Sequence, residues 1–383
     1  MPDRLLRTLR TTALASATAV VSATALAAGP ATAVPDGPAE PRTVRELLPV
    51  LRELYRQAEE AGEAYNATAE RLKVQRAETG QLQAALRQAR AALDQSRDEA
   101  GRLARRQYQG ASELSGYLRL LLARSPQEAL DEGHLMERAN SGNAAAIARL
   151  ENSELRADDL AARSRKALAV QRSLADRQRR ERSTVQARLE TAQALLARLS
   201  AEERTQLEHL ERTGMDQAQR ALLASGVLGA GARLPSRQGG AAVGYAIRQI
   251  GKPYVWGATG PLAFDCSGLT SQAWAAAGRP IPRTSQEQWA RLPRIPLHSL
   301  RPGDLVIYFP RATHVAIYLG SGLVIQAPRP GTRVKVSPLA SNPVLGAVRP
   351  DPASTPLLSY TPPMLPKHAA AGSDTGYASA TAP

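Results

Sequence analysis

Apolar side chains recur every three to four residues over a long stretch in the first half of the chain. From Leu47 to Leu103, seventeen positions follow one another in alternating steps of four and three, and thirteen of them are apolar. An unbroken heptad pattern of this length is typical of a coiled-coil seam rather than of an ordinary globular helix. A second, looser seam from Leu160 to Leu210 predicts another long helix over about residues 144–210.

A leucine-rich stretch, residues 110–143, lies between the two predicted helices. We therefore predict an α-helical coiled-coil hairpin over residues 43–216, with a small helical lobe at about 110–143 forming its tip. An intermolecular coiled coil is the alternative that the pattern leaves open. Region 43–216 carries 29 basic and 27 acidic residues, a balance that indicates a solvated helix surface without special attraction for a charged partner.

The hydrophobic pattern changes after residue 216. Gly and Ala dominate residues 217–238, which predicts a flexible linker. Residues 239–350 contain short apolar runs separated by turn residues and hold all three tryptophans and both phenylalanines, so we expect a globular α+β domain there. Residues 351–383 consist mostly of Pro, Ala, Ser and Thr, and are predicted to be a disordered tail.

The first residues have the pattern of an export signal. Arg4, Arg7 and Arg10 precede an uncharged stretch that ends in a small-x-small sequence at Ala31–Ala33. This arrangement predicts a signal peptide over residues 1–33. A membrane anchor is the alternative, but the many Ala and Thr residues favour cleavage. We therefore expect a secreted, extracellular protein with no nucleic-acid partner.

Charge and cysteine content narrow the function further. The chain has a net charge of +14, and residues 239–350 alone carry twelve basic and three acidic side chains. A basic domain of this kind favours an anionic partner. The single cysteine excludes an intrachain disulfide framework and any multi-cysteine zinc site. No cluster of His and Cys could hold a metal ion, so we expect no metal and no cofactor.

The single cysteine, Cys266, is the candidate nucleophile. It precedes a helical pattern that runs from Leu269 to Ala277, so it lies at or near a helix N-terminus. The helix dipole and free amides there favour a thiolate and can hold an oxyanion. A buried structural cysteine is the alternative reading. Cys266 is unpaired in a protein that we expect to be exported, and small polar residues flank it. Both features favour a nucleophilic role over a structural one.

A cysteine nucleophile needs a base, and His314 has the best position among the five histidines. It opens an apolar run typical of a core strand, which would hold the imidazole rigidly. Residues 320–322 predict a turn that leads into a returning strand. If the turn has three residues, Leu319 pairs with Leu323, and Gln326 lies diagonal to His314 on the same face. A two-residue turn would place Gln326 on the opposite face.

Several sequence blocks together resemble the NlpC/p60 family of papain-like cell-wall endopeptidases. The blocks cover about residues 239–350 in order, and they are GKPYVWG at 251–257, FDCSGL at 264–269, RTS at 283–285, LRPGDLV at 300–306 and HVAIY at 314–318. The resemblance implies a papain-like domain in which a helix bearing the cysteine packs on an antiparallel sheet bearing the histidine. It also implies hydrolysis of peptidoglycan stem peptides, usually between γ-D-glutamate and a diamino acid.

By this resemblance, Cys266 corresponds to the nucleophile, His314 to the base and Gln326 to the third polar residue. Many relatives have histidine where this chain has Gln326, and glutamine supports the imidazole less strongly. Tyr254 resembles the tyrosine that approaches the nucleophile and helps to bind the oxyanion.

Three further residues are expected to bind substrate. Asp265 and Ser267 resemble groove residues near the stem-peptide amine. Arg283 is either a clamp for a substrate carboxylate or a surface arginine.

The helical region resembles the regulatory regions of hydrolases that separate daughter cells in actinobacteria and firmicutes. This similarity implies that residues 110–143 dock on a transporter-like membrane complex of cell division. We also hypothesise that the hairpin restrains the catalytic domain, because a flexible linker would let one module fold over the other. Peptidoglycan and anionic wall polymers are the other expected partners. Two alternatives stay open: a non-catalytic scaffold that binds the wall and recruits another hydrolase, and acyl transfer or amidase chemistry on the same residues.

Overall fold

A computed structural model describes most of the chain as one compact unit within Arg42–Pro383. The described residues are 43–108, 118–229, 231, 233–372 and 374. The signal peptide predicted at 1–33 lies outside them, as do residues 109–117 of the predicted tip lobe. No helix among the described residues combines the length and the hydrophobicity that crossing a membrane requires.

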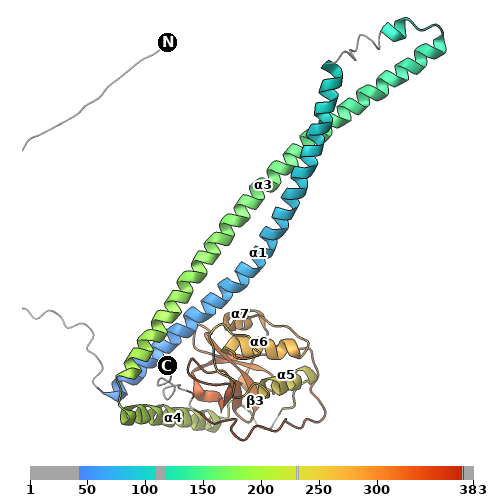
Figure 1. The fold of residues 1–383 in the computed structure, drawn as a ribbon. Helices are drawn as coiled ribbons and strands as arrows, with labels where there is room; N and C mark the ends of the chain where they lie inside the picture. Colours follow the sequence, from blue (N-terminus) through green and yellow to red (C-terminus); the bar gives the residue numbers. More distant parts are fainter. Residues whose placement is uncertain (1–42, 109–117, 230, 232, 373, 375–383) are drawn as a thin grey trace, which may run out of the picture. The chain divides into compact units, whose positions relative to one another are not determined.

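Two long helices, α1 (Val44–Tyr108) and α3 (Pro126–Ala197), run side by side in opposite directions (Figure 1). The hydrogen bond between Ser96 and Ser153 and the ion pair between Arg97 and Glu154 join them along their length. Every predicted seam position of α1 is buried or half-buried. The heptad pattern therefore predicted correctly which face of α1 packs against its partner, and the long helices themselves are confirmed.

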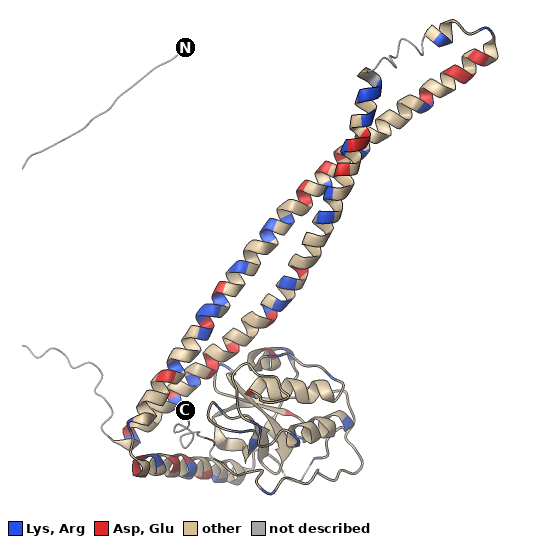
Figure 2. Ribbon diagram, in the orientation of Figure 1, with Lys and Arg blue, Asp and Glu red and all other residues tan. Residues whose placement is uncertain are grey.

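The predicted tip lobe is smaller than expected. Ser125 accepts a hydrogen bond from the Glu128 backbone N–H, and Pro126 occupies the first turn, so α3 begins here rather than at about residue 144. Residues 126–143 therefore belong to the long helix, and a single helical turn at 118–121 precedes it. Figure 2 shows acidic and basic residues interspersed along both helices, as expected of a solvated surface.

The predicted linker is largely structured. Helix α4 (Ala201–Ala224) starts at a capping box formed by Ser200 and Glu203, and it continues well past residue 217. Gln219 near its end donates to the Gly322 carbonyl at 2.8 Å and accepts from the Ala340 N–H at 3.0 Å. The expectation of a free linker over 217–238 is therefore wrong, because side-chain hydrogen bonds fasten its first part to the catalytic domain.

The C-terminal domain is built on one antiparallel sheet. Its strands are β1 (Arg294–Ile295), β2 (Leu305–Tyr308), β3 (His314–Gly320), β4 (Leu323–Gln326), β5 (Lys335–Pro338) and β6 (Val344–Val348). The spatial order is β1-β6-β2-β3-β4-β5, with antiparallel pairing throughout. The central strands β2 and β3 are almost entirely buried, which matches their continuous apolar runs.

Both faces of the sheet are covered. Helices α5 (Arg237–Ile247) and α6 (Cys266–Ala276) pack on one face together with Leu305 and Ile307 of β2. Val306 and Tyr308 of the same strand point to the other face. That face is covered by residues of α4 and by the short helices η1 (Leu297–Ser299) and η2 (Leu339–Ser341). The predicted α+β domain preceded by long helices is thus confirmed.

The tail is ordered over the part that the structure describes. Residues 351–372 have no regular secondary structure, yet Asp351 is buried and the Ala369 carbonyl accepts from the Val336 N–H at 2.8 Å. The disorder predicted for 351–383 is therefore wrong up to residue 372. Composition misled the prediction because backbone groups and one carboxylate, rather than large apolar side chains, attach this segment.

We predict that Asp351→Ala destabilises the catalytic domain. Asp351 forms an ion pair with the buried Arg301 at 2.9 Å and accepts a hydrogen bond from Ser236, which caps α5. Removing one partner of a buried pair leaves a desolvated charge, so the free energy of unfolding should fall by about 3 kcal/mol. Urea unfolding followed by tryptophan fluorescence measures this change. The exposed Asp216→Ala is the control, and equal midpoints for both variants would contradict the prediction.

Candidate active site

Cys266 is the first residue of α6. The helix is capped by Asp265, whose Oδ1 accepts from the Gly268 N–H at 2.6 Å. Gly268 permits the tight approach of the preceding loop, because a Cβ there would lie 2.2 Å from the Ala258 carbonyl oxygen. The thiol is therefore held at a helix N-terminus, as predicted. Cys266 is only 2% exposed, and its burial, followed by the nearby Glu63 and Asp265 carboxyls, raises the thiol pKa well above its usual value.

His314 and Gln326 lie on adjacent strands and contact each other. His314 Nε2 is 2.7 Å from Gln326 Oε1, and the Gln326 amide nitrogen donates to Ser341 Oγ at 3.4 Å. Because the amide oxygen only accepts, Nε2 carries the proton and Nδ1 keeps its lone pair. Burial lowers the pKa of His314 to about 4, although the hydrogen bond that the ring donates to Gln326 acts in the opposite direction.

The strand register explains this contact. Ile317 pairs with Ile325 and Tyr318 with Val324, which places Gln326 on the same face as His314, as a three-residue turn predicts. The pairing nearest the turn differs from the prediction. Leu323 pairs with Gly320 instead of Leu319, because the strand pair has a register shift between residues 318 and 320.

Tyr254 lies on the loop before α6 and forms an isolated parallel bridge with Phe264. It is 8% exposed, and its pKa is raised well above the usual value, first by burial and then by Cys266 and Asp265. The structure thus brings this tyrosine into the electrostatic environment of the thiol, although its oxyanion role stays a prediction.

Arg283 is buried against the residues expected to bind substrate. Its guanidinium makes a bidentate ion pair with Asp265, at 3.1 and 2.7 Å, and donates to Ser267 Oγ at 2.8 Å. The alternative of a surface arginine is therefore wrong. Because Asp265 already holds both terminal guanidinium nitrogens, Arg283 orients Asp265 and Ser267, and its role as a carboxylate clamp stays a prediction.

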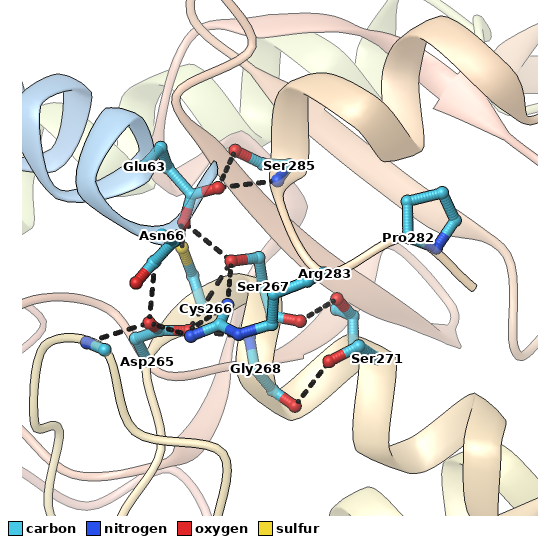
Figure 3. Close-up of polar contacts among 12 residues, drawn as sticks. Glu63, Asn66, Asp265, Cys266, Ser267, Gly268, Ser271, Pro282, Arg283 and Ser285 are labelled. Atoms are coloured by element: carbon cyan, nitrogen blue, oxygen red, sulfur yellow. Dashed lines mark hydrogen bonds and ion pairs between the residues drawn. The ribbon is translucent and has the colours of Figure 1, made fainter. Parts of the chain in front are cut away.

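Helix α1 supplies two residues that sequence reasoning missed (Figure 3). Glu63 accepts hydrogen bonds from Ser267 Oγ at 2.6 Å, from the Ser285 N–H at 2.7 Å and from Ser285 Oγ at 3.0 Å. The Cys266 thiol lies 3.9 Å from the same carboxyl group. Asn66, one turn further along α1, donates to Asp265 Oδ2 at 3.1 Å. Glu63 is 3% exposed, and burial raises its pKa to about 7.

A third α1 residue, Glu59, faces the histidine. Its Oε1 is 3.6 Å from His314 Nδ1, and burial raises the pKa of Glu59 to about 8. Glu59 also lines a cavity of about 760 Å³ that adjoins Gln326 and Arg329. The catalytic candidates are therefore enclosed by α1 on both the cysteine side and the histidine side.

Close backbone approach brings α1 to this position. Gly62 packs against Trp256, and a Cβ at Gly62 would lie 2.5 Å from the indole nitrogen. Tyr65 stacks on the same indole with ring centroids 4.4 Å apart, and Glu60 pairs with Arg311 nearby. A glycine inside a long helix was the one sequence signal that could have indicated this contact. The glutamates could not, because they read as ordinary charges of a solvated helix.

The described residues hold no group of three or more His, Cys, Asp or Glu side chains that could bind a metal ion. The groups around Cys266 and His314 are instead hydroxyls, one ion pair and the two carboxyl groups of α1. This set of groups can carry nucleophilic attack on an acyl carbon with proton transfer by the imidazole.

Comparison with known proteins shows which family the C-terminal domain matches. The NlpC/P60 family profile matches residues 251–347. A probable endopeptidase of Corynebacterium glutamicum is 49% identical over 111 residues, which are 29% of this chain and 53% of that protein. The peptidoglycan endopeptidase RipA of Mycolicibacterium smegmatis is 39% identical, over 28% of this chain and 26% of that protein.

A solved NlpC/p60 domain of the peptidoglycan hydrolase SagA is 38% identical and aligns with a TM-score of 0.28, covering 29% of this chain and 97% of that one. The chain spans about half or less of the curated relatives it matches. The matched segment contains Tyr254, Cys266, His314 and Gln326. Residues 251–347, which carry the buried cysteine and its histidine, are therefore an NlpC/P60 domain.

Proposed function

We propose that this protein is a secreted cysteine endopeptidase that hydrolyses peptidoglycan stem peptides in wall remodelling or daughter-cell separation. The observation that carries the proposal is Cys266 at the N-terminus of α6, with the hydrogen-bonded pair His314 and Gln326 on the adjoining sheet. The names of the relatives, an endopeptidase and a peptidoglycan endopeptidase, support the substrate class. The scissile bond, by family resemblance, joins γ-D-glutamate to a diamino acid.

The reaction uses the nitrogen that Gln326 leaves free. His314 Nδ1 accepts the thiol proton, and the Cys266 thiolate attacks the amide carbonyl to form a C–S bond. The oxyanion accepts hydrogen bonds from the Cys266 N–H and from Tyr254. The imidazolium then protonates the leaving amine as the C–N bond breaks. Water, deprotonated by His314, hydrolyses the thioester and restores the thiol.

The enzyme rests in a restrained form in which α1 covers the catalytic groups. Asp265, Ser267 and Ser285 are almost fully buried, and each of them bonds to a side chain of α1. Cys266 and His314 are equally inaccessible to a substrate as large as a peptide. This burial supports self-inhibition by α1 as the regulation of the site.

Partners act at the two ends of the molecule. The basic catalytic domain binds anionic wall polymers, and this binding weakens with salt. Residues 110–143 dock on a transporter-like membrane complex of cell division, and docking releases α1. Exposed Leu121, Leu122 and Leu130 in the described part of this segment support an apolar contact there.

A non-catalytic scaffold is the alternative function. It would need neither a hydrogen-bonded imidazole nor a thiol at a helix N-terminus, and both are present. Acyl transfer or amidase chemistry uses the same residues and is distinguished by the products.

Release of α1 should activate the full-length protein. Gly62→Leu forces a side chain into Trp256, whereas Gly80→Leu gains the same helix propensity with nothing within 4 Å. We expect Gly62→Leu to hydrolyse purified cell walls at least about tenfold faster than the wild type, since ten- to a hundredfold corresponds to about 1.4–3 kcal/mol of lost docking. Dye release from labelled walls measures the rate. Gly80→Leu should match the wild type, and equal rates for both variants would exclude restraint by α1.

The released fragments test the chemistry. In the Gly62→Leu background, Cys266→Ala should abolish all new fragments, because the nucleophile is lost. Mass spectrometry of the soluble products identifies the bond that is cut. If folded Gly62→Leu protein releases nothing that the Cys266→Ala variant does not release, the endopeptidase function is wrong.

Gln326 should matter for the rate of catalysis rather than for substrate binding. In the same Gly62→Leu background, Gln326→Ala removes the group that holds the imidazole in one tautomer. We expect kcat to fall about 10–100-fold, part of the contribution of general acid–base catalysis, with KM nearly unchanged. Steady-state kinetics on a soluble stem peptide separates the two constants. A rise in KM at constant kcat would instead assign Gln326 to substrate binding.

A further inference from the structure

Two glutamates of α1 each face one member of the catalytic pair. Glu63 Oε1 lies 3.9 Å from Cys266 Sγ, and Glu59 Oε1 lies 3.6 Å from His314 Nδ1. Residues four apart lie on the same face of a helix, so one face of α1 reaches both catalytic groups. A helix that only covered the groove would not need an acid opposite each of them.

The carboxyl group of Glu63 accepts hydrogen bonds from the C-terminal domain and does not only lie close to it. One carboxyl oxygen accepts from Ser267 Oγ and lies nearest the thiol, while the other accepts from the N–H and Oγ of Ser285. All of these partners use Glu63 as an acceptor, and the group is almost fully buried. The catalytic domain therefore holds this carboxyl in one orientation, with an oxygen directed at Cys266 (Figure 3).

Glu59 is held less completely. Among the residues that the structure describes, neither its buried Oε2 nor His314 Nδ1 has a hydrogen-bond partner. Nδ1 is the atom that must take the thiol proton, because Nε2 is bonded to Gln326. In the structure this lone pair faces an acid of α1.

From this geometry we infer that α1 inactivates the catalytic pair chemically as well as covering it. Glu63 replaces His314 as the hydrogen-bond acceptor of the Cys266 thiol, and Glu59 faces the histidine nitrogen that would accept the proton. The two glutamates together form a lock that keeps the thiol and the imidazole from acting on each other. This inference rests on the proposed function, because a lock regulates the protein only if the protein is an enzyme. The reactivity of the Cys266 thiol can nevertheless be measured without a substrate.

The electrostatics agree with the lock. Burial and the Glu63 carboxyl raise the thiol pKa well above its usual value, and burial lowers the pKa of His314 to about 4. At pH 7 the pair is therefore a neutral thiol and a neutral imidazole rather than a thiolate and an imidazolium. A thiolate is the reactive form of cysteine, so the locked enzyme should react slowly with any electrophile.

The test compares the alkylation of Cys266 by iodoacetamide in full-length variants at pH 7. The chain has one cysteine, so the mass of the intact protein counts the adduct directly. Glu59→Gln and Glu63→Gln keep the volume and the helix propensity of the side chains. A glutamine side chain has one acceptor oxygen where the carboxyl group has two. At position 63, the NH₂ group must therefore face one of the donors of Ser267 or Ser285.

We expect the double variant Glu59→Gln/Glu63→Gln to be alkylated about 10–100-fold faster than the wild type, the range expected when a buried group loses its hydrogen-bond partner. Each single variant should give a smaller increase. The matched control is Glu70→Gln/Glu78→Gln, which makes the same pair of substitutions at exposed positions of α1. The control should react at the wild-type rate.

The outcomes separate the lock from the proposed function. If Gly62→Leu is alkylated faster but the glutamine variants match the wild type, α1 only covers the site and the lock is wrong. An equal increase in the control variant would also overturn it, because the effect would then be one of general charge. If alkylation rises in the double variant but no wall fragments appear, the lock stands and the endopeptidase function fails.

Discussion

The buried carboxyl of Glu63 is the contact on which the closed arrangement depends. A carboxyl group without water is stable only if its oxygens are satisfied, and here Ser267 and Ser285 supply the donors. Those donors belong to the catalytic groove, so the requirement to satisfy one residue of α1 also determines which surface α1 covers. A small displacement of the helix would leave both the carboxyl and the groove hydroxyls unsatisfied.

Helix α1 packs against α3 with one face and against the C-terminal domain with another. Leu47 and Leu51 pack against residues of α3, while Glu59, Glu63 and Asn66 face the C-terminal domain. Because both faces belong to one rigid helix, a change in its packing against α3 must also change its contacts with the groove. This coupling is the physical basis on which the long helical region is proposed to control the C-terminal domain.

The catalytic candidates were largely predictable because they are local. His314 and Gln326 lie on adjacent strands of one hairpin, so their side of the sheet follows from the length of the turn. The position of Cys266 could be predicted from the helical pattern that follows it, because Cys266 is the first residue of that helix. The linker and the tail were predicted wrongly for a common reason. Their attachment depends on Gln219, Asp351 and backbone hydrogen bonds and on a few leucines such as Leu222, and composition does not reveal such contacts.

The sequence by itself determined the long helices, the α+β domain, the candidate nucleophile and its histidine, since each of these follows from periodicity, from a helix start or from a single turn. Only the tertiary structure decided that Arg283 is held by Asp265 and that Glu59 and Glu63 enter the site from about 200 residues away. A glutamate on a solvated helix and a glutamate in a catalytic groove look identical in a sequence. What distinguishes them is which donors surround them, and packing between distant segments alone decides that.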